Sequence, residues 1–260
     1  RVMIVGGEVG MGGAVLLAGR AALRGGAGLV RIATRADNLP GILAAQPELM
    51  TAPVESGQDL DPVMDWPGVI VIGPGLGRSG WAQQLLQRVC ARPAAGDKSL
   101  RVVLDADALN LLAERPDWWA RLSSCAELVI TPHPGEAARL LGVSGDVIQS
   151  DRPSAVRELA GRFGCTAVLK GAGSLVASAS GGAMWLCPHG NPGLASGGSG
   201  DVLAGLIGAL LGQGLPGLGA AAVGVHVHAL AADDCARGPG ERGLAAGDLP
   251  DAVRLHLNAL

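Results

Sequence analysis

The sequence predicts an α/β fold with a central, mainly parallel sheet covered by helices on both faces. Short apolar runs alternate along the chain with stretches of helical periodicity, and this alternation is typical of parallel sheets. The runs are apolar throughout, as expected of strands that are buried on both faces. The length of 260 residues and the hydrophobic content of 48% suit one large domain that covers residues 1–260.

The first two thirds of the chain follow this alternation closely. We predict strands at Val2–Val5, Leu29–Thr34, Val69–Ile72, Val102–Asp105, Leu128–Thr131 and Ala167–Lys170. We predict helices between them at Ala14–Arg24, Trp81–Arg92, Ala106–Ala113 and Pro153–Phe163. The stretch Pro53–Asp65 is the least regular, and we expect a surface loop there.

The last third departs from the alternation. Two short apolar runs, Leu175–Ser178 and Met184–Leu186, flank Gly181-Gly182 and predict a hairpin near one edge of the sheet. Helical patterns then follow at Val202–Leu211, Leu218–Arg237 and Leu249–Leu257. We expect these helices to close the fold.

The run without charged residues between Asp201 and Asp233 is long enough to suggest a membrane span. The turn residues at 212–217, however, divide it into pieces shorter than the roughly 20 residues that a span requires. We therefore expect two buried helices joined by a turn, and no membrane partner.

Composition and charge narrow the classes of partner. A net charge of −3 and a pI near 5.9 give no electrostatic reason to expect nucleic acid. Five tryptophans, one phenylalanine and no tyrosine also leave few platforms for base stacking. The five cysteines are scattered and odd in number, at positions Cys90, Cys125, Cys165, Cys187 and Cys235. They predict buried thiols in a reducing cytoplasm, not disulfides or zinc ligands.

The segment Asn191–Gln213 carries the strongest functional signal, because a glycine-rich loop ends there in Asp201 and a helical pattern follows at once. Glycines let backbone N–H groups approach a ligand closely, and a helix N-terminus attracts phosphate. A carboxylate beside that phosphate can take a proton from a hydroxyl group. On the local pattern, an N-cap role for Asp201 is an equally good interpretation. The loop lacks G-x-x-x-x-G-K-[ST] and is not a P-loop.

Further motifs stand where predicted strands end. Gly73, Asp105, Thr131 and Lys170 all finish or follow a strand, and ligands of open parallel sheets bind beyond the carboxyl ends of the strands. Carboxylates at Asp105 and Asp107 suit Mg²⁺ held through water, or ribose hydroxyls. We expect Asp105 to serve function and Asp107 to cap the next helix. The sequence therefore predicts a ligand site along one rim of the sheet.

Several of these segments resemble one superfamily. Gly198-Ser199-Gly200-Asp201 resembles the GxGD anion hole of ribokinase-like kinases, which implies a ribokinase-like three-layer α/β/α fold. The longer string NPGLASGGSGDVLAGL is similar to the C-terminal signature of the ADP-dependent NAD(P)H-hydrate dehydratases. Segments at Gly6–Val30, Val71–Gly77, Leu104–Asn110, Thr131–Gly142 and Leu169–Val176 resemble that family in the same order.

One position separates the dehydratases from their kinase relatives. Many kinases of the superfamily carry TPNxxE where this chain reads TPHPGE, and His133 in the asparagine position resembles the dehydratase form. This argues against the alternative of a hydroxymethylpyrimidine or thiazole kinase. A nucleotide-binding module without catalysis is a second alternative, against which the presence of Asp201 counts.

The resemblance also implies roles for individual residues. It implies a catalytic base at Asp201, and substrate contacts at Ala14, Gly75, Asp105, His133 and Asp201. It implies nucleotide contacts at Lys170, Gly171, Ala172, Gly173, Ser174, Gly198, Ser199 and Gly200. Glu136 matches an acidic residue that organises water around Mg²⁺, although a carboxylate in the first turn of a helix explains it equally well. We expect His226 and His228 to be packed core histidines.

The activity that the resemblance implies is repair of damaged nicotinamide cofactors. NADHX and NADPHX are hydrated forms of NADH and NADPH, and the family dehydrates their S epimers with ADP as phosphoryl donor and Mg²⁺ as cofactor. The family further implies a cytoplasmic homo-oligomer, a tetramer, working with a fused or separate epimerase. Because the chain opens directly on the strand Val2–Val5, we expect that an N-terminal segment precedes it.

Overall fold

The computed structural model describes residues 1–94, 99–122 and 124–259. Its centre is a sheet whose strands run in the order β3-β2-β1-β4-β5-β6-β7-β8-β9. Neighbours from β3 to β7 pair in parallel, and β8 and β9 add to one edge in antiparallel pairing. The strands are β1 Val2–Val5, β2 Val30–Thr34, β3 Met50–Pro53, β4 Val69–Ile72, β5 Arg101–Leu104, β6 Glu127–Ile130, β7 Thr166–Leu169, β8 Ser174–Ser178 and β9 Trp185–Cys187. The α/β fold and its mainly parallel sheet are therefore confirmed.

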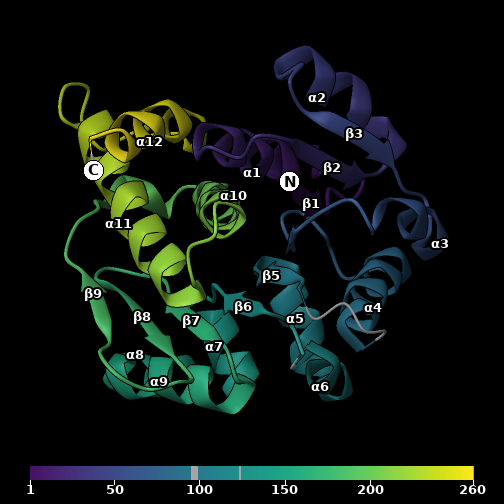
Figure 1. Ribbon diagram of the computed structural model, residues 1–260. Helices are drawn as coiled ribbons and strands as arrows, with labels where there is room; N and C mark the ends of the chain where they lie inside the picture. Colours follow the sequence, from purple (N-terminus) through teal and green to yellow (C-terminus); the bar gives the residue numbers. More distant parts are fainter. Residues whose placement is uncertain (95–98, 123, 260) are drawn as a thin grey trace.

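Helices cover both faces of this sheet (Figure 1). Against one face pack the helices α1 Gly12–Arg24, α10 Ser199–Gly212, α11 Gly217–Ala236 and α12 Leu249–Leu257. Against the other pack α4 Gly80–Ala94, α5 Ala106–Glu114, α7 Pro134–Leu141, α8 Gly145–Ser150 and α9 Arg152–Phe163. The short helices are α2 Leu39–Ala45, α3 Gly57–Leu60 and α6 Trp119–Leu122. Among the described residues, two large hydrophobic cores result, one on each face of the sheet, with a smaller cluster that joins residues of α1, α10 and α11 to Leu244, Ala246 and Leu249.

Helix α10 lies closest to the centre of the fold, because small residues let it pack tightly against α1 and the sheet. A Cβ atom built on Gly205 would lie 2.0 Å from the carbonyl oxygen of Ala18, and one built on Gly208 would lie 2.5 Å from Cγ2 of Val71. Every residue from Val202 to Leu211 is buried. The prediction of two buried helices joined by a turn is confirmed, and no helix in the described ranges has the length and hydropathy of a membrane span.

The structure contains several elements beyond those expected from the sequence. Helices α2, α7 and α8 and strand β3 were not predicted, since each is short and its apolar period is interrupted. The expectation of a surface loop at Pro53–Asp65 is wrong in part. That stretch contains α3, and the side chains of Val54 and Leu60 are fully buried against the core.

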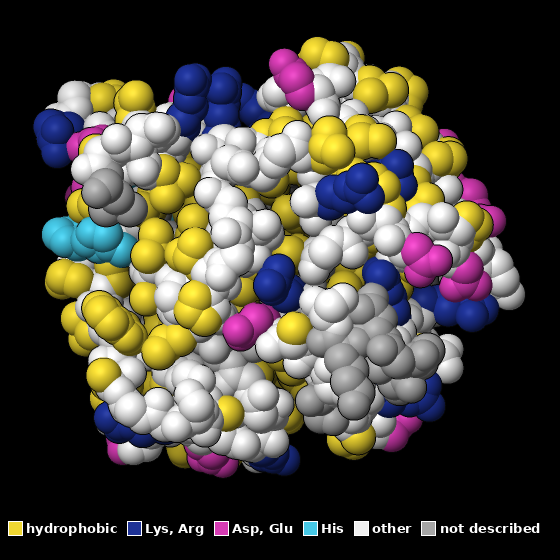
Figure 2. Space-filling model, in the orientation of Figure 1, with side chains coloured by type: hydrophobic (Ala, Val, Ile, Leu, Met, Phe, Trp, Pro, Cys, Tyr) yellow, Lys and Arg dark blue, Asp and Glu magenta, His cyan; other side chains and the backbone are white. Residues whose placement is uncertain are grey.

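The hairpin forms as expected, although β8 begins one residue earlier than predicted and β9 is shifted by one residue toward the C-terminus. Its outer strand β9 is the edge of the sheet, where Trp185 and Leu186 are 55% and 59% exposed. Figure 2 shows hydrophobic side chains gathered near this edge, next to histidine side chains. This edge is therefore an exposed apolar surface, and such surfaces are common at sites of interaction.

Candidate active site

An ion pair between the buried Asp105 and the partly buried Lys170 lies at the rim formed by the carboxyl ends of the strands. Asp105 follows β5, Thr131 follows β6 and Lys170 follows β7. The carboxylate oxygen Oδ1 of Asp105 accepts hydrogen bonds from Lys170 Nζ and Thr131 Oγ1, each over 2.7 Å. Asp105 is 1% exposed, so its charge depends on Lys170 for compensation.

A second carboxylate, Glu136, adds to the negative charge around Lys170. Burial would by itself lower the pKa of Lys170, but the charges of Asp105 and Glu136 outweigh burial, so this pKa is raised. Burial likewise opposes ionisation of Glu136, yet hydrogen bonds from His133 and the charge of Lys170 hold its pKa below the ordinary value. Both Lys170 and Glu136 are therefore charged at neutral pH.

His133 begins helix α7 and is held by that helix. Its backbone N–H donates to Glu136 Oε2 over 2.8 Å, and its ring Nδ1 accepts from the Gly135 N–H over 3.0 Å. Because Nδ1 accepts, the neutral ring carries its proton on Nε2, which lies 3.2 Å from Glu136 Oε1. The imidazole is half exposed. Its aim is thus set by a capping box as well as by the flanking prolines.

Asp201 lies in the first turn of α10. The N-cap of this helix is Gly198, with φ 94°, so the interpretation of Asp201 as the N-cap is wrong. In the described part of the chain, the Asp201 carboxylate makes no hydrogen bond and no ion pair. Burial, followed by the negative charge of Asp105, raises its pKa to about 7, although the charge of Lys170 opposes the rise. A carboxyl group with this pKa exchanges protons readily at neutral pH.

The first turn of α10 faces the ion pair through Gly200. A Cβ atom on Gly200 would lie 3.2 Å from Lys170 Nζ and 3.8 Å from Asp105 Oδ2, so glycine leaves space between the helix and the lysine. The Gly198 N-cap makes no side-chain hydrogen bond. The first N–H groups of the helix therefore have no side-chain cap, and such free groups at a helix N-terminus favour anion binding.

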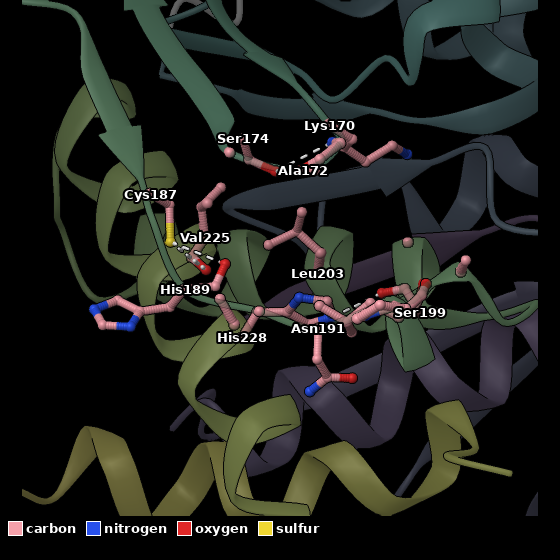
Figure 3. Close-up of a pocket in the computed structure, with 18 of the residues that line it drawn as sticks. Lys170, Ala172, Ser174, Cys187, His189, Asn191, Ser199, Leu203, Val225 and His228 are labelled. Atoms are coloured by element: carbon pink, nitrogen blue, oxygen red, sulfur yellow. Dashed lines mark hydrogen bonds between the residues drawn. The ribbon is translucent and has the colours of Figure 1, made fainter. Parts of the chain in front are cut away.

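A cavity of about 550 Å³ opens beside this turn (Figure 3). Lys170, Gly171, Ala172, Gly173, Ser174, Ser199 and Gly200, all predicted to contact nucleotide, line it. Gly198 is not among the lining residues and instead faces Leu17 and Ala246. Sequence reasoning missed the opposite wall, which includes His189, Asn191, Leu203, Val225 and His228. Asn191 and Leu203 lie within the signature string, which was the one signal available for that wall.

Residues outside the cavity hold its two loops in place. The Arg152 guanidinium donates to the carbonyl oxygens of Leu169 and Gly173, beneath the loop 170–174. Asp233 accepts hydrogen bonds from the Gly190 N–H and from Asn191 Nδ2, each over 3.0 Å. Both supports come from distant sequence positions, so the cavity walls are fixed by tertiary contacts.

Ala14 and Gly75 meet farther along the same rim. A Cβ atom on Gly75 would lie 3.0 Å from Cβ of Ala14 and 2.7 Å from the carbonyl oxygen of Met11, and its φ is +55°. The loops after β1 and β4 also exchange backbone hydrogen bonds, with the Glu8 N–H donating to the Gly75 carbonyl over 2.7 Å. Gly73 packs against the backbone of Asp105, and Asp105 in turn accepts a hydrogen bond from Lys170, which lines the cavity.

Three other expectations can be compared with the structure. Asp107 does not cap α5, because its Oδ2 accepts from the Gly77 N–H and its Oδ1 from the Asn110 side chain. His228 is buried as predicted, whereas His226 is only partly buried and stacks edge-on against His189. Of the cysteines, Cys90, Cys165 and Cys187 are buried, and Cys125 and Cys235 are partly buried.

No protein cage for a metal ion is found in the described ranges, where no three histidine, cysteine or acidic side chains are grouped for one. The Asp105 carboxylate is committed to Lys170 and Thr131, and that of Glu136 to His133. This donor set fits Mg²⁺ carried by nucleotide phosphates and reached through water, and does not fit a resident ion.

The chain matches the family model for NAD(P)H-hydrate dehydratase over residues 2–254. It is 47% identical to the bifunctional NAD(P)H-hydrate repair enzyme of Coxiella burnetii over 257 residues, which are 99% of this chain and 50% of that one. It is 42% identical to the ADP-dependent (S)-NAD(P)H-hydrate dehydratase of Neisseria meningitidis, covering 96% of this chain and 82% of that one. The chain thus spans about half the length of the bifunctional relatives.

Solved structures agree with the family. A ribokinase-like superfamily protein from Enterococcus faecalis superposes with a TM-score of 0.87 at 30% identity, covering 100% of this chain and 87% of that one. The ADP/ATP-dependent NAD(P)H-hydrate dehydratase of Bacillus subtilis, co-crystallised with ATP/Mg²⁺ and soaked with CoA, gives 0.82 at 28% identity. That match covers 99% of this chain and 91% of the other. The fold is therefore ribokinase-like.

Proposed function

Because the chain belongs to the NAD(P)H-hydrate dehydratase family, we propose that it dehydrates the S epimer of NADHX or NADPHX, with ADP as phosphoryl donor. The products are NADH or NADPH, AMP and phosphate. One observation carries the proposal. The unpaired carboxyl group of Asp201, whose pKa is raised to about 7, lies near the partly buried Lys170. It belongs to the first turn of a helix without a side-chain cap, and Ser199 and Gly200 of that turn line the cavity.

The chemistry explains why a dehydratase needs a nucleotide. Hydroxide is a poor leaving group, so direct loss of water from the hydrated ring is slow. We assign Asp201 as the base that takes the proton from the C6 hydroxyl group of the hydrate. The oxygen of that hydroxyl group then attacks the terminal phosphorus of ADP. The bond from that phosphorus to AMP breaks, and phosphate then leaves C6 as the neighbouring ring carbon loses a proton. The reduced nicotinamide is thereby restored.

The remaining residues position and neutralise charge, which is most of what phosphoryl transfer requires of a protein. We assign the N–H groups of Gly198, Ser199 and Gly200 to the transferred phosphoryl group. We assign Lys170 and the loop that extends to Ser174 to binding of the nucleotide. A nucleotide-bound Mg²⁺, with Glu136 reaching it through water, would shield phosphate oxygens.

The hydrate would lie against Ala14, Gly75, Asp105 and His133. The support for this assignment is that Ala14 and Gly75 meet on the rim next to Asp105, and that His133 joins the same rim through Glu136 and Lys170. The His133 imidazole is half exposed, and its two nitrogens contact Glu136 and the Gly135 N–H at the start of α7.

We further propose that an NAD(P)HX epimerase, fused or separate, supplies the S epimer. The support is that relatives about twice as long are named bifunctional repair enzymes. We propose a cytoplasmic homo-oligomer, in keeping with buried thiols and the exposed apolar strand β9. Light scattering after size-exclusion chromatography measures its mass, and a tetramer is expected.

The decisive experiment supplies NADHX and records NADH absorbance with ADP, with ATP and without nucleotide. With ADP, we expect NADH, AMP and inorganic phosphate in equal amounts, because the phosphate ester exists only in passing. A kinase would instead release a stable phosphorylated product. Efficient phosphorylation of a hydroxymethylpyrimidine or thiazole alcohol, together with no change in NADHX, would reverse the proposal.

A further inference from the structure

A histidine from a distant helix reaches the first turn of α10. Nε2 of His228, on α11, lies 2.9 Å from the carbonyl oxygen of Ser199, and the side chain is 7% exposed. Figure 3 shows the His228 ring projecting from α11 toward Ser199 at the cavity wall, with the hydrogen bond dashed. The family motifs do not include this residue, and the proposed reaction gives it no task.

The His228 imidazole is a fixed neutral donor. A carbonyl oxygen only accepts, so Nε2 must carry the ring proton. Burial lowers the pKa of His228 to about 4, the bond to Ser199 opposes the fall, and the charge of Lys170 adds to it. The ring is therefore uncharged at neutral pH and serves neither as an acid nor as a base there.

Ser199 is fastened at two points in a segment that glycine would otherwise leave loose. Its hydroxyl group donates to the Leu194 carbonyl over 2.7 Å, and its own carbonyl accepts from His228. Gly197, Gly198 and Gly200 surround it, and glycine restricts the backbone least. An anion site made of backbone N–H groups stabilises charge only when those groups are already oriented.

The planarity of the peptide bond connects this fastening to the anion site. The carbonyl group of Ser199 and the N–H group of Gly200 belong to one rigid peptide unit and point in opposite directions. Fixing the oxygen on the His228 side therefore fixes the direction of the Gly200 N–H on the other side. A hydrogen bond accepted by the carbonyl also polarises the unit, which strengthens its N–H as a donor.

We infer that His228 is a positioning residue for the anion site, acting through the Ser199–Gly200 peptide to aim the Gly200 N–H at the transferred phosphoryl group. The inference rests on the proposed function for the identity of the reaction. Its physical content, an anion site that needs the His228 donor, holds for any phosphoryl group bound there.

Two amide variants test the inference as a matched pair. In His228→Gln, the side-chain nitrogen stands as many bonds from Cβ as Nε2 of histidine and can donate to Ser199. In His228→Asn, the same amide is one methylene shorter and falls short. Binding of inorganic phosphate to protein saturated with AMP, measured by calorimetry, reports on the anion site, and binding of AMP alone reports on the rest of the cavity.

For His228→Asn we expect phosphate binding and kcat to fall by on the order of tenfold, the usual effect of one lost hydrogen bond near charge, with AMP affinity within twofold of the original. For His228→Gln we expect both quantities within threefold of the original. Equal loss in the two variants, equal weakening of AMP and phosphate, or no phosphate binding by the original protein beside AMP would each overturn the inference. Unchanged phosphate binding in His228→Asn would overturn it too.

The same measurements separate this inference from the proposed function. If phosphate binding behaves as expected but NADHX is not converted, the dehydratase proposal fails and the role of His228 stands. If NADHX is converted and phosphate binding is unchanged in His228→Asn, the role of His228 fails and the dehydratase stands. Thermal melting of both variants checks that each is folded.

Discussion

The two halves of the rim are built differently. The half proposed for the nucleotide is a cavity of about 550 Å³, whose loops are held from behind by Arg152, Asp233 and His228. The half proposed for the hydrate has two glycine loops that hold each other, near Gly75. Its exposed apolar side chains, Val9 at 64% and Met11 at 38%, have no cover in the described part of the chain.

This difference shows how one site can bind two ligands that require different degrees of rigidity. Phosphoryl transfer needs donors already oriented before reaction, and supports from distant elements provide that rigidity. A hydrated nicotinamide dinucleotide is large, and an open rim with apolar side chains suits a surface completed by the ligand. Variants in one half should therefore leave binding in the other half unchanged, and the following predictions test that separation.

The largest effect is expected at Asp201, where the two halves join. In Asp201→Asn, loss of the base should reduce kcat by on the order of 10²–10⁴ while the KM values for nucleotide and hydrate stay within about threefold. Steady-state kinetics with NADHX and ADP measure all three. Activity within a few-fold of the original protein would show that Asp201 does not remove the proton.

Next in size is a methyl group placed in the hydrate half. Gly75→Ala sets a Cβ atom 2.7 Å from the Met11 carbonyl oxygen, so the two loops must shift, and we expect the hydrate KM to rise by on the order of tenfold with nucleotide KM unchanged. The matched control is Gly214→Ala, which has similarly positive φ but open space around it, in the turn before α11. Both variants lose stability from the backbone. If Gly214→Ala raises the hydrate KM equally, the effect comes from stability alone.

A smaller effect is expected from the support of the nucleotide half. Asp233→Asn turns an amide N–H₂ toward one of two donors, so the loop that bears Asn191 loses one hydrogen bond. We expect the nucleotide KM to rise about three- to tenfold, with hydrate KM and kcat within twofold. Asp234→Asn is the control, since Asp234 pairs with Arg237 and His256. Equal effects in the two variants would contradict a specific clamp.

The smallest effect concerns pH and the stability of the unliganded fold. The pKa of Asp201 is raised from 3.8 to about 7, so the folded chain binds a proton that the unfolded chain has released. This group therefore lowers the free energy of unfolding progressively from about pH 4 to pH 7 and fully above that. Asp201→Asn should be more stable than the original protein at pH 8 and equally stable at pH 4, by urea denaturation. In the original protein, kcat/KM should rise with pH through about 7.

These two halves were also unequally predictable from the sequence. Buried parallel strands and long helices have clear sequence patterns. The bounds of β1 and β4 therefore match the prediction to the residue, and most of the topology follows. Loop 170–174 and the turn 198–201 stand at strand and helix ends, and family motifs marked them. The wall formed by Val225 and His228 could not be predicted, because α11 is apolar on almost every face and its pattern does not say which residues meet a cavity.

Two expectations about helix ends differ from the structure for a common physical reason. Asp107 was expected to cap a helix, and capping was one of two interpretations of Asp201, because acidic residues are common at helix starts. In each case a tertiary contact or a neighbouring glycine decided otherwise, through Gly77 for Asp107 and Gly198 at the start of α10. The local sequence pattern indicates which residues can cap a helix, but tertiary contacts determine which of them does.

The close approach of α10 to α1 and the sheet gives the segment Asn191–Gln213 a second meaning. At Gly205 and Gly208 the neighbouring atoms, the Ala18 carbonyl oxygen and Cγ2 of Val71, leave no volume for any side chain. Helix packing therefore requires these glycines, whereas the proposed reaction requires Asp201. A descendant of this protein that no longer catalysed the reaction could replace Asp201, but it would still need glycine at positions 205 and 208 for α10 to pack. A motif can thus outlive the chemistry by which it is recognised.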